Sequence, residues 1–348
     1  MGAPGMERFV VGTGRCGSTL LSRMLGKAPE VVSLFEFFNG LDMSERFSPG
    51  PISGKVLAEL ISREQPFVTA VLRRGYPVEE ITYPFADEAT GGRGRGKHRR
   101  GDPLPWILVS TLPRLTDEPD ALLEKVCQFA ATLPEQPPRD HYLALFAWLG
   151  EEFGRSTWIE RSGSSIDYAA DLTRLYPNAR FVHLHRAGAE VALSMREHHA
   201  YRLPISLLYD VPLASGQRVS EAPALDLHSP PEPGDTISQI LASRPPAEYF
   251  GRYWADQILR GKPALDALSP GRVLEIAFED LVSRPEQTLA EVAQFLELDT
   301  ARAGKSWIPG ASRLVRGIPP LRAPGLDERE HESLLAACAP ANRLLAHP

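Results

Sequence analysis

A short apolar run, a glycine-rich turn and a helical apolar pattern follow one another within residues 8–25. Residues 9–11, Phe-Val-Val, predict a buried strand, because β-branched and aromatic side chains favour extended backbone. The turn at 12–17 holds three glycines, and apolar residues recur at helical spacing over 20–25. Unpaired backbone N–H groups and the positive end of the helix dipole meet where such a helix begins. The stretch therefore predicts an anion-binding site.

The side chains of this turn suit a single phosphate or sulfate group better than the triphosphate of ATP or GTP. Gly12 and Gly17 have the separation found in the ATP and GTP phosphate loop, but Ser18 stands where that motif needs lysine. Without the lysine, the β- and γ-phosphates lose their main cationic partner. Arg15 supplies a cation inside the turn, and Thr19 adds a second hydroxyl. A plain glycine turn, with Arg15 in solvent, is the alternative interpretation.

The composition indicates which partners, compartment and metal ligands to expect. Among 348 residues, 38 are Lys or Arg and 44 are Asp or Glu, which gives a net charge of −6. This balance favours neither a nucleic-acid nor a membrane partner. No apolar run is long enough for a membrane span and residues 1–7 lack a signal-peptide pattern, so we expect a cytoplasmic protein. Cys16, Cys127 and Cys338 lie far apart without metal-ligand spacing, so we expect free thiols and no metal.

Further apolar runs alternate with helical patterns along the chain. Strands are predicted at 31–35, 157–160, 179–186 and 271–278, and helices at 140–153, 166–175, 187–195, 249–259, 285–296 and 327–338. Strands that alternate with helices indicate a parallel sheet covered on both faces. We therefore predict an α/β fold in a single domain, 1–348. It is a three-layer sandwich with a central parallel sheet flanked by helices and a P-loop-like phosphate site.

Two long segments interrupt this alternation. Residues 40–140 predict a large helical insertion, with amphipathic helices at 55–63 and 120–132. Residues 203–246 are rich in proline and predict a long loop or flap. Inside the insertion, residues 91–101 place five cations among glycines. They suit a solvated loop, a mobile lid over an anionic ligand or an RNA-contacting segment, of which RNA is the weakest because no aromatic residue is interleaved.

Glu36 ends the second predicted strand. In parallel sheets ligands bind outside the carboxyl ends of the strands, so this carboxylate is expected beside the glycine turn. Phe35, Phe37 and Phe38 flank it, and we expect them to exclude water and to raise the pKa of Glu36 toward that of a general base. An ordinary glutamate in solvent is the alternative, and His141 is the next candidate for the base.

A second strand-to-helix junction lies at 179–194, with the sequence Ala-Arg-Phe-Val-His-Leu-His-Arg-Ala-Gly-Ala-Glu-Val-Ala-Leu-Ser. Together with the glycine turn, it resembles the two signatures by which sulfotransferases hold 3′-phosphoadenosine 5′-phosphosulfate (PAPS). The residues that match the 3′-phosphate signature are Arg186 and Ser194, about two helical turns apart. The chain departs from the family at Ala187 and Gly188, where an acid and a proline are usual, so we expect this helix start to lack its acid.

The resemblance implies a PAPS-dependent sulfotransferase that acts on a hydroxyl of a small-molecule, carbohydrate, lipid or carrier-tethered acceptor. It implies Glu36 as the base and Arg15 as the clamp on the sulfuryl group. The implied cofactor-binding residues are Gly14, Arg15, Cys16, Gly17, Ser18, Thr19, Arg186 and Ser194, with Arg313 and Arg316 in a final loop. Residues 40–140 and 203–246 would form the acceptor site. A kinase-like nucleotide phosphotransferase, or a non-enzymatic nucleotide- or RNA-binding protein, is the alternative.

Overall fold

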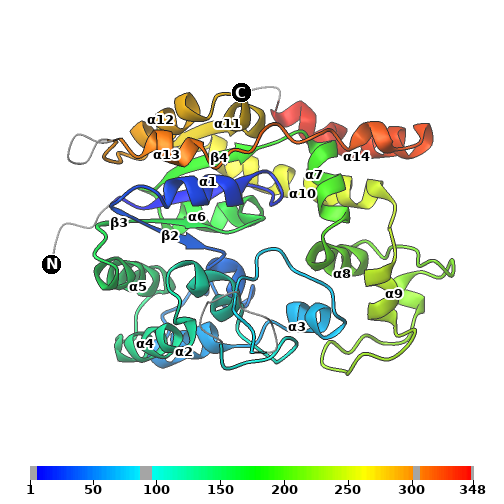
Figure 1. Ribbon diagram of the computed structural model, residues 1–348, viewed down its shortest axis with the longest axis horizontal. Coiled ribbons are helices and arrows are strands. Elements are labelled where there is room, and N and C mark those ends of the chain that lie inside the picture. Colours follow the sequence, from blue (N-terminus) through cyan, green and yellow to red (C-terminus); the bar gives the residue numbers. More distant parts are fainter. Residues whose placement is uncertain (1–5, 87–95, 301–305, 346–348) are drawn as a thin grey trace. The chain divides into compact units, whose positions relative to one another are not determined.

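The computed structural model describes residues 6–86, 96–300 and 306–345. Its five strands are β1 (Arg8–Val11), β2 (Val31–Phe35), β3 (Thr157–Arg161), β4 (Arg180–His185) and β5 (Val273–Ala277). They form one sheet in the order β2-β3-β1-β4-β5, and neighbouring strands run parallel. Figure 1 labels β2, β3 and β4 of this sheet. The predicted α/β fold with a central parallel sheet is confirmed, and the five strands lie close to their predicted ranges.

The chain divides into two compact units. The first, which we call the sheet unit, comprises Met1–Leu60, Val126–Arg186 and Gln257–Pro320. The second, the helical unit, comprises Ile61–Lys125, Ala187–Asp256 and Leu321–Pro348. Three helices contribute residues to both: α2 (Gly54–Ser62), α4 (Pro119–Thr132) and α10 (Ala247–Asp266). The segment predicted as an insertion, 40–140, is likewise shared by the two units.

Helices cover both faces of the sheet. The sheet unit holds α1 (Ser18–Leu25), α5 (Pro138–Glu152), α6 (Ala169–Leu175), α11 (Phe278–Ser283), α12 (Pro285–Phe295) and α13 (Ile308–Ser312). Phe9 and Trp158 lie on one face, where Phe146 of α5 and Tyr176 after α6 pack against them. Side chains alternate along a strand, so Arg161 of β3 lies on the opposite face, where it reaches α1. This gives the predicted three layers.

The helical unit has an apolar core of its own. It contains α3 (Pro66–Arg73), α7 (Gly188–Arg196), α8 (His199–Leu208), α9 (Thr236–Ala242) and α14 (Glu328–Leu345). Val71 of α3, Leu203 of α8 and Ile240 of α9 are buried in one cluster. Beside this cluster, Arg74 donates from Nη2 to Asp235 Oδ1 at 3.0 Å, and Asp235 caps the start of α9. An ion pair thus fastens α3 to α9.

The segment 203–246, predicted as a long loop or a partly ordered flap, contains the end of α8, which reaches Leu208, and the whole of α9. Pro204 lies inside α8, where the burial of Leu203 and Ile205 outweighs the loss of one backbone hydrogen bond. The helices predicted at 55–63 and 120–132 are confirmed as α2 and α4. The single domain, and the part of these segments in an acceptor site, stay predictions.

Candidate functional site

The glycine turn between β1 and α1 has a backbone suited to anions. Gly14, Arg15 and Gly17 have φ values of 74°, 51° and 96°, a region that residues other than glycine rarely occupy. α1 begins directly after Gly17, which has no side chain to cap the first N–H groups of the helix. The first turn of α1 therefore presents backbone donors where an anion can bind them.

Buried groups hold this turn in place. The Cys16 side chain is fully buried, and a Cβ on Gly12 would come within 2.7 Å of its sulfur. The Gly12 N–H donates to Ser165 Oγ at 3.3 Å, and the Gly12 carbonyl accepts from the Ile166 N–H at 3.2 Å. Cys16 thus packs inside the turn, and only its backbone can serve the predicted ligand.

Arg161 connects this turn to Glu36. It ends β3, is 1% exposed, pairs through Nη1 with Glu36 Oε1 and donates from Nη2 to Thr19 Oγ1 at 2.7 Å. Because Arg161 donates to the Thr19 oxygen, the Thr19 hydroxyl keeps its own proton for another acceptor. Glu36 also accepts from the Gly163 N–H at 3.0 Å and from Asn39 Nδ2 at 2.6 Å. The structure links Glu36 to the first turn of α1, and its role as a base stays a prediction.

Glu36 is 4% exposed, as the predicted exclusion of water requires, but its carboxylate has polar partners. Phe37 and Phe38 pack against Phe146 of α5, with ring centroids 5.0 and 5.9 Å from it. Phe35 lies under the Arg161 guanidinium, with its ring centroid 4.0 Å from Cζ. Glu36 has φ +58°, which breaks the alternation of the strand and turns its side chain away from its neighbours. The carboxylate contacts a cation, a side-chain amide and a backbone N–H.

The Phe278 ring contacts both segments that carry the predicted binding residues, the glycine turn and the end of β4. It is the first residue of α11, directly after β5, and is 8% exposed. A Cβ on Gly17 would collide with its ring, so the ring lies against the glycine turn. Arg186, which follows β4, places its Cζ 4.5 Å from the centroid of the same ring. The turn and Arg186 therefore share one aromatic ring.

The start of α7 departs from the family pattern for a packing reason. A Cβ on Gly188 would come within 2.5 Å of the buried Trp254 ring, so proline has no room there. The usual acid is absent at Ala187, but Glu190 supplies a carboxylate in the first turn of α7. Its carboxylate accepts from the N–H groups of Arg322 and Ala323 at 2.9 and 3.1 Å. The acid at this helix start thus binds the chain itself.

The other predicted site residues are distributed over both units. Ser194 lies on α7 in the helical unit and is 5% exposed, so its action together with Arg186 stays a prediction. Arg313 and Arg316 follow α13 in the sheet unit, and both are exposed. His141 is fully buried in α5, and its Nε2 lies 2.8 Å from a backbone carbonyl oxygen. This burial argues against His141 as the base.

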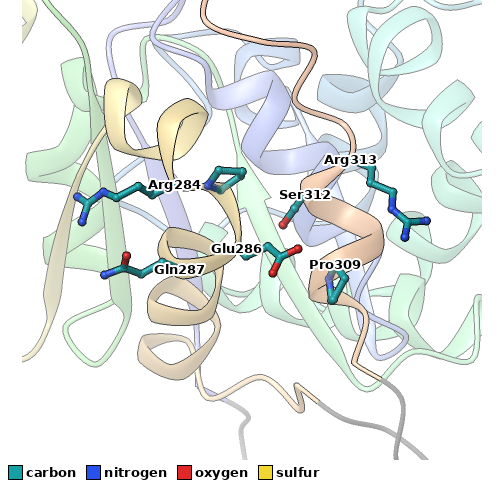
Figure 2. Close-up of a pocket in the computed structure, with 7 residues that line it drawn as sticks. Arg284, Glu286, Gln287, Pro309, Ser312 and Arg313 are labelled. Carbon is teal, nitrogen blue, oxygen red and sulfur yellow. The ribbon is translucent and has the colours of Figure 1, made fainter.

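Arg313 also lines a cavity of about 450 Å³ between α12 and α13. Figure 2 shows Glu286 and Ser312 near its middle, with Arg284 and Arg313 on opposite sides. Charges of both signs line this cavity, so it favours no single class of ligand. Of the basic segment 91–101, residues 91–95 lie outside the described residues, and its function as a lid stays a prediction.

Sequence reasoning missed Arg161, Phe278 and Asn39. Arg161 could have been found by the argument used for Glu36, because it too stands at the carboxyl end of a strand. Phe278 follows a predicted strand, but nothing in the sequence indicates that its ring contacts residues from two other strand ends. Asn39 carries no local signal. No group of histidine, cysteine and carboxylate side chains within residues 6–86, 96–300 and 306–345 is arranged to hold a metal ion.

A family model described as the sulfotransferase family matches residues 241–302, less than a fifth of the chain. This match confirms the predicted resemblance to the sulfotransferase family over these residues. The matched segment begins at the end of α9 and continues past α12. It contains none of the predicted site residues, so their roles rest on the motifs and on the geometry described above.

Several solved sulfotransferases show a distant likeness. The sulfotransferase domain of the Synechococcus PCC 7002 olefin synthase is 18% identical, with 97% of this chain and 95% of that one covered and a TM-score of 0.44. STF1 of Mycobacterium tuberculosis H37Rv is 16% identical, with coverage of 97% and 77% and a TM-score of 0.45. A sulfotransferase of Alicyclobacillus acidocaldarius is 17% identical, with coverage of 99% and 96% and a TM-score of 0.39. At these TM-scores the likenesses support no further argument. No curated protein matches the chain.

A membrane span is not found in the part of the chain that the structure describes, where every helix is too short or too polar to cross a bilayer.

Proposed function

We propose that this chain transfers a sulfuryl group from PAPS to a hydroxyl group of a small-molecule, carbohydrate, lipid or carrier-bound acceptor. The observation that carries the proposal is the Phe278 ring, which contacts both the glycine turn and Arg186. PAPS has a phosphosulfate at one end and a 3′-phosphate at the other, so it needs two anion-binding groups. The turn offers backbone donors for the first, and the Arg186 guanidinium offers charge for the second.

In the proposed reaction, the bond between sulfur and the donor phosphate oxygen breaks, and a bond from sulfur to the acceptor oxygen forms. Negative charge spreads over the sulfuryl oxygens, and it is stabilised by Arg15, the Thr19 hydroxyl and the first N–H groups of α1. Glu36 accepts the proton that the acceptor hydroxyl loses. Arg161 holds Glu36 and Thr19 in one arrangement through its two Nη atoms. The products are a sulfate ester and 3′-phosphoadenosine 5′-phosphate (PAP).

Titration calorimetry with PAP, ATP and a short RNA tests the class of ligand. We expect PAP to bind at least tenfold more tightly than ATP, because the turn lacks the lysine that a triphosphate needs. Tighter binding of ATP would support the phosphotransferase, and binding of RNA alone would support the non-enzymatic alternative. Transfer of label from PAPS to an extract of small molecules and carrier proteins then identifies the acceptor.

A further inference from the structure

Glu160 is a buried carboxyl group that the proposed reaction leaves unused. It precedes Arg161 in β3 and is 1% exposed. Side chains alternate along a strand, so Glu160 and Arg161 lie on opposite faces of the sheet. Arg161 holds the carboxylate of Glu36 on one face. The contacts of Glu160 show what is held on the other.

Glu160 binds the backbone that follows Glu36. Its Oε1 accepts from Ser162 Oγ at 2.5 Å and from the Phe38 N–H at 3.4 Å. Ser162 Oγ accepts from the same N–H at 3.1 Å. Glu36 itself has φ +58°, which a residue other than glycine keeps only where its neighbours fix it. One of these neighbours is the Arg161 carbonyl, which accepts from the Glu36 N–H at 2.8 Å.

Burial raises the pKa of the Glu160 carboxyl to about 8, and the negative charge of Glu36 acts in the same direction. The hydrogen bonds from Ser162 and from the Phe38 N–H, and the charge of Arg161, act in the opposite direction. The carboxyl is therefore neutral at pH 7.

Three more groups face Glu160 from neighbouring elements. Burial raises the pKa of the Tyr168 and Tyr176 hydroxyls, and Glu160 adds to both effects, so both phenols stay neutral. Arg46 lies over the Tyr168 ring, with Cζ 4.0 Å from its centroid, and it donates from Nη1 to the Phe38 carbonyl at 3.1 Å. Glu160 is therefore the group in this region whose pKa lies near neutral pH.

We propose that Glu160 is a positioning residue that holds the turn at 37–39 and thereby directs the Glu36 carboxylate toward the first turn of α1. This inference rests on the proposed function, in which Glu36 accepts a proton. When Glu160 ionises, a second negative charge appears close to Glu36, and it competes for the field of Arg161. Turnover should therefore fall as the pH rises through the pKa of Glu160.

Glu160→Gln is the deciding variant, because an amide has the size of the protonated acid and keeps an acceptor for Ser162 and Phe38. Release of labelled sulfate from PAPS, with water as the acceptor, gives a turnover number before the natural acceptor is known. We expect wild-type turnover to fall about tenfold between roughly pH 7 and 9, and that of Glu160→Gln to fall less than about twofold. Glu160→Ala should lose about tenfold in kcat at roughly pH 7, with the Kd for PAP unchanged.

Glu7→Gln is the matched control, since Glu7 is a buried carboxylate of the same unit that pairs with Arg139. It should keep the wild-type fall in turnover at alkaline pH. An equal fall in Glu160→Gln and the wild type would overturn the proposal, and so would a kcat for Glu160→Gln as low as that of Glu160→Ala.

Thermal unfolding separates failure of this inference from failure of the proposed function. If PAP neither binds nor forms, the proposed function fails, and the protonation of Glu160 is still measurable. The folded pKa of about 8 lies above the model-compound value of 4.5, so the folded state holds the extra proton between these values. The associated stability is present below about pH 4.5 and is lost as the pH rises through about 8. The wild type should show this loss and Glu160→Gln should not; equal loss in both would exclude a neutral carboxyl.

Discussion

The helices α1 and α7 both begin directly after a strand of the sheet, but their first turns are occupied in different ways. Before α1, Gly14, Arg15 and Gly17 have positive φ, and the turn offers backbone N–H groups. Before α7, Ala187 has φ −48°, and the first turn holds the carboxylate of Glu190. That carboxylate binds the backbone N–H groups at 322–323. In the proposed function one helix start binds a ligand, whereas the acid in the first turn of the other binds the protein's own backbone.

This difference assigns separate physical roles to the two anion sites of the proposed donor site. At α1 the backbone comes close to the ligand, and Gly17 is required because Phe278 leaves no room for a side chain. At α7 the positive end of the helix dipole already faces the Glu190 carboxylate. Recognition of a 3′-phosphate after β4 should therefore depend on the Arg186 guanidinium more than on the helix start.

The largest effect is expected from Glu36, the proposed proton acceptor, which Arg161 connects to the α1 turn. Glu36→Gln keeps the size of the side chain but cannot take up the proton, so turnover should fall by about 10²–10⁴. Binding of PAP should change little, because Thr19 and the backbone donors remain. Steady-state transfer from PAPS and calorimetry with PAP measure the two quantities. Turnover close to that of the wild type would show that another group is the base.

The backbone role of the α1 turn is tested by Gly17→Ala. The new Cβ would collide with Phe278 and would also occupy a strained φ of 96°. We expect the affinity for PAP to fall by about a hundredfold, equivalent to about 2.7 kcal/mol. Gly50→Ala is the control, because open space surrounds that position and its affinity should not change. An unchanged Kd for Gly17→Ala would remove the turn from the donor site.

The glycine turn and the strands were predictable because each depends on residues close together in the sequence. The bridge between Glu36 and Thr19 was not. β1 and β2 are consecutive in the chain, but β3 lies between them in the sheet and brings Arg161 to that position. Phe278 is similar, since it reaches the turn from the end of β5, at the edge of the sheet. Such contacts depend on strand order, which local patterns do not encode.

A smaller effect, limited to one part of the ligand, is expected at the second junction. Arg186→Ala removes a charge-assisted contact of about 1.5–3 kcal/mol, so the affinity for PAP should fall about 10- to 150-fold. Binding of AMP, which lacks the 3′-phosphate, should change much less. The ratio of the two dissociation constants, measured by calorimetry, isolates the contact. Arg180→Ala, at the other end of β4, should leave the ratio unchanged, and an equal loss for PAP and AMP would assign Arg186 a structural role.

The smallest effect on ligand binding is expected from substitution of Glu190. This substitution is the strictest test of the difference between the two helix starts. Glu190→Ala leaves the N–H groups of Arg322 and Ala323 without their carboxylate acceptor, and Glu190 is 4% exposed. The free energy of unfolding should fall by about 1–3 kcal/mol, while the ratio of PAP to AMP affinity stays within about twofold of the wild type. Glu190→Gln keeps one acceptor oxygen and should lose less stability. Denaturant unfolding and calorimetry provide both numbers. Strongly tighter PAP binding by Glu190→Ala would contradict this expectation, because the start of α7 would then bind the anion once its acid is removed. The two helix starts would differ only in whether a carboxylate of the protein occupies them.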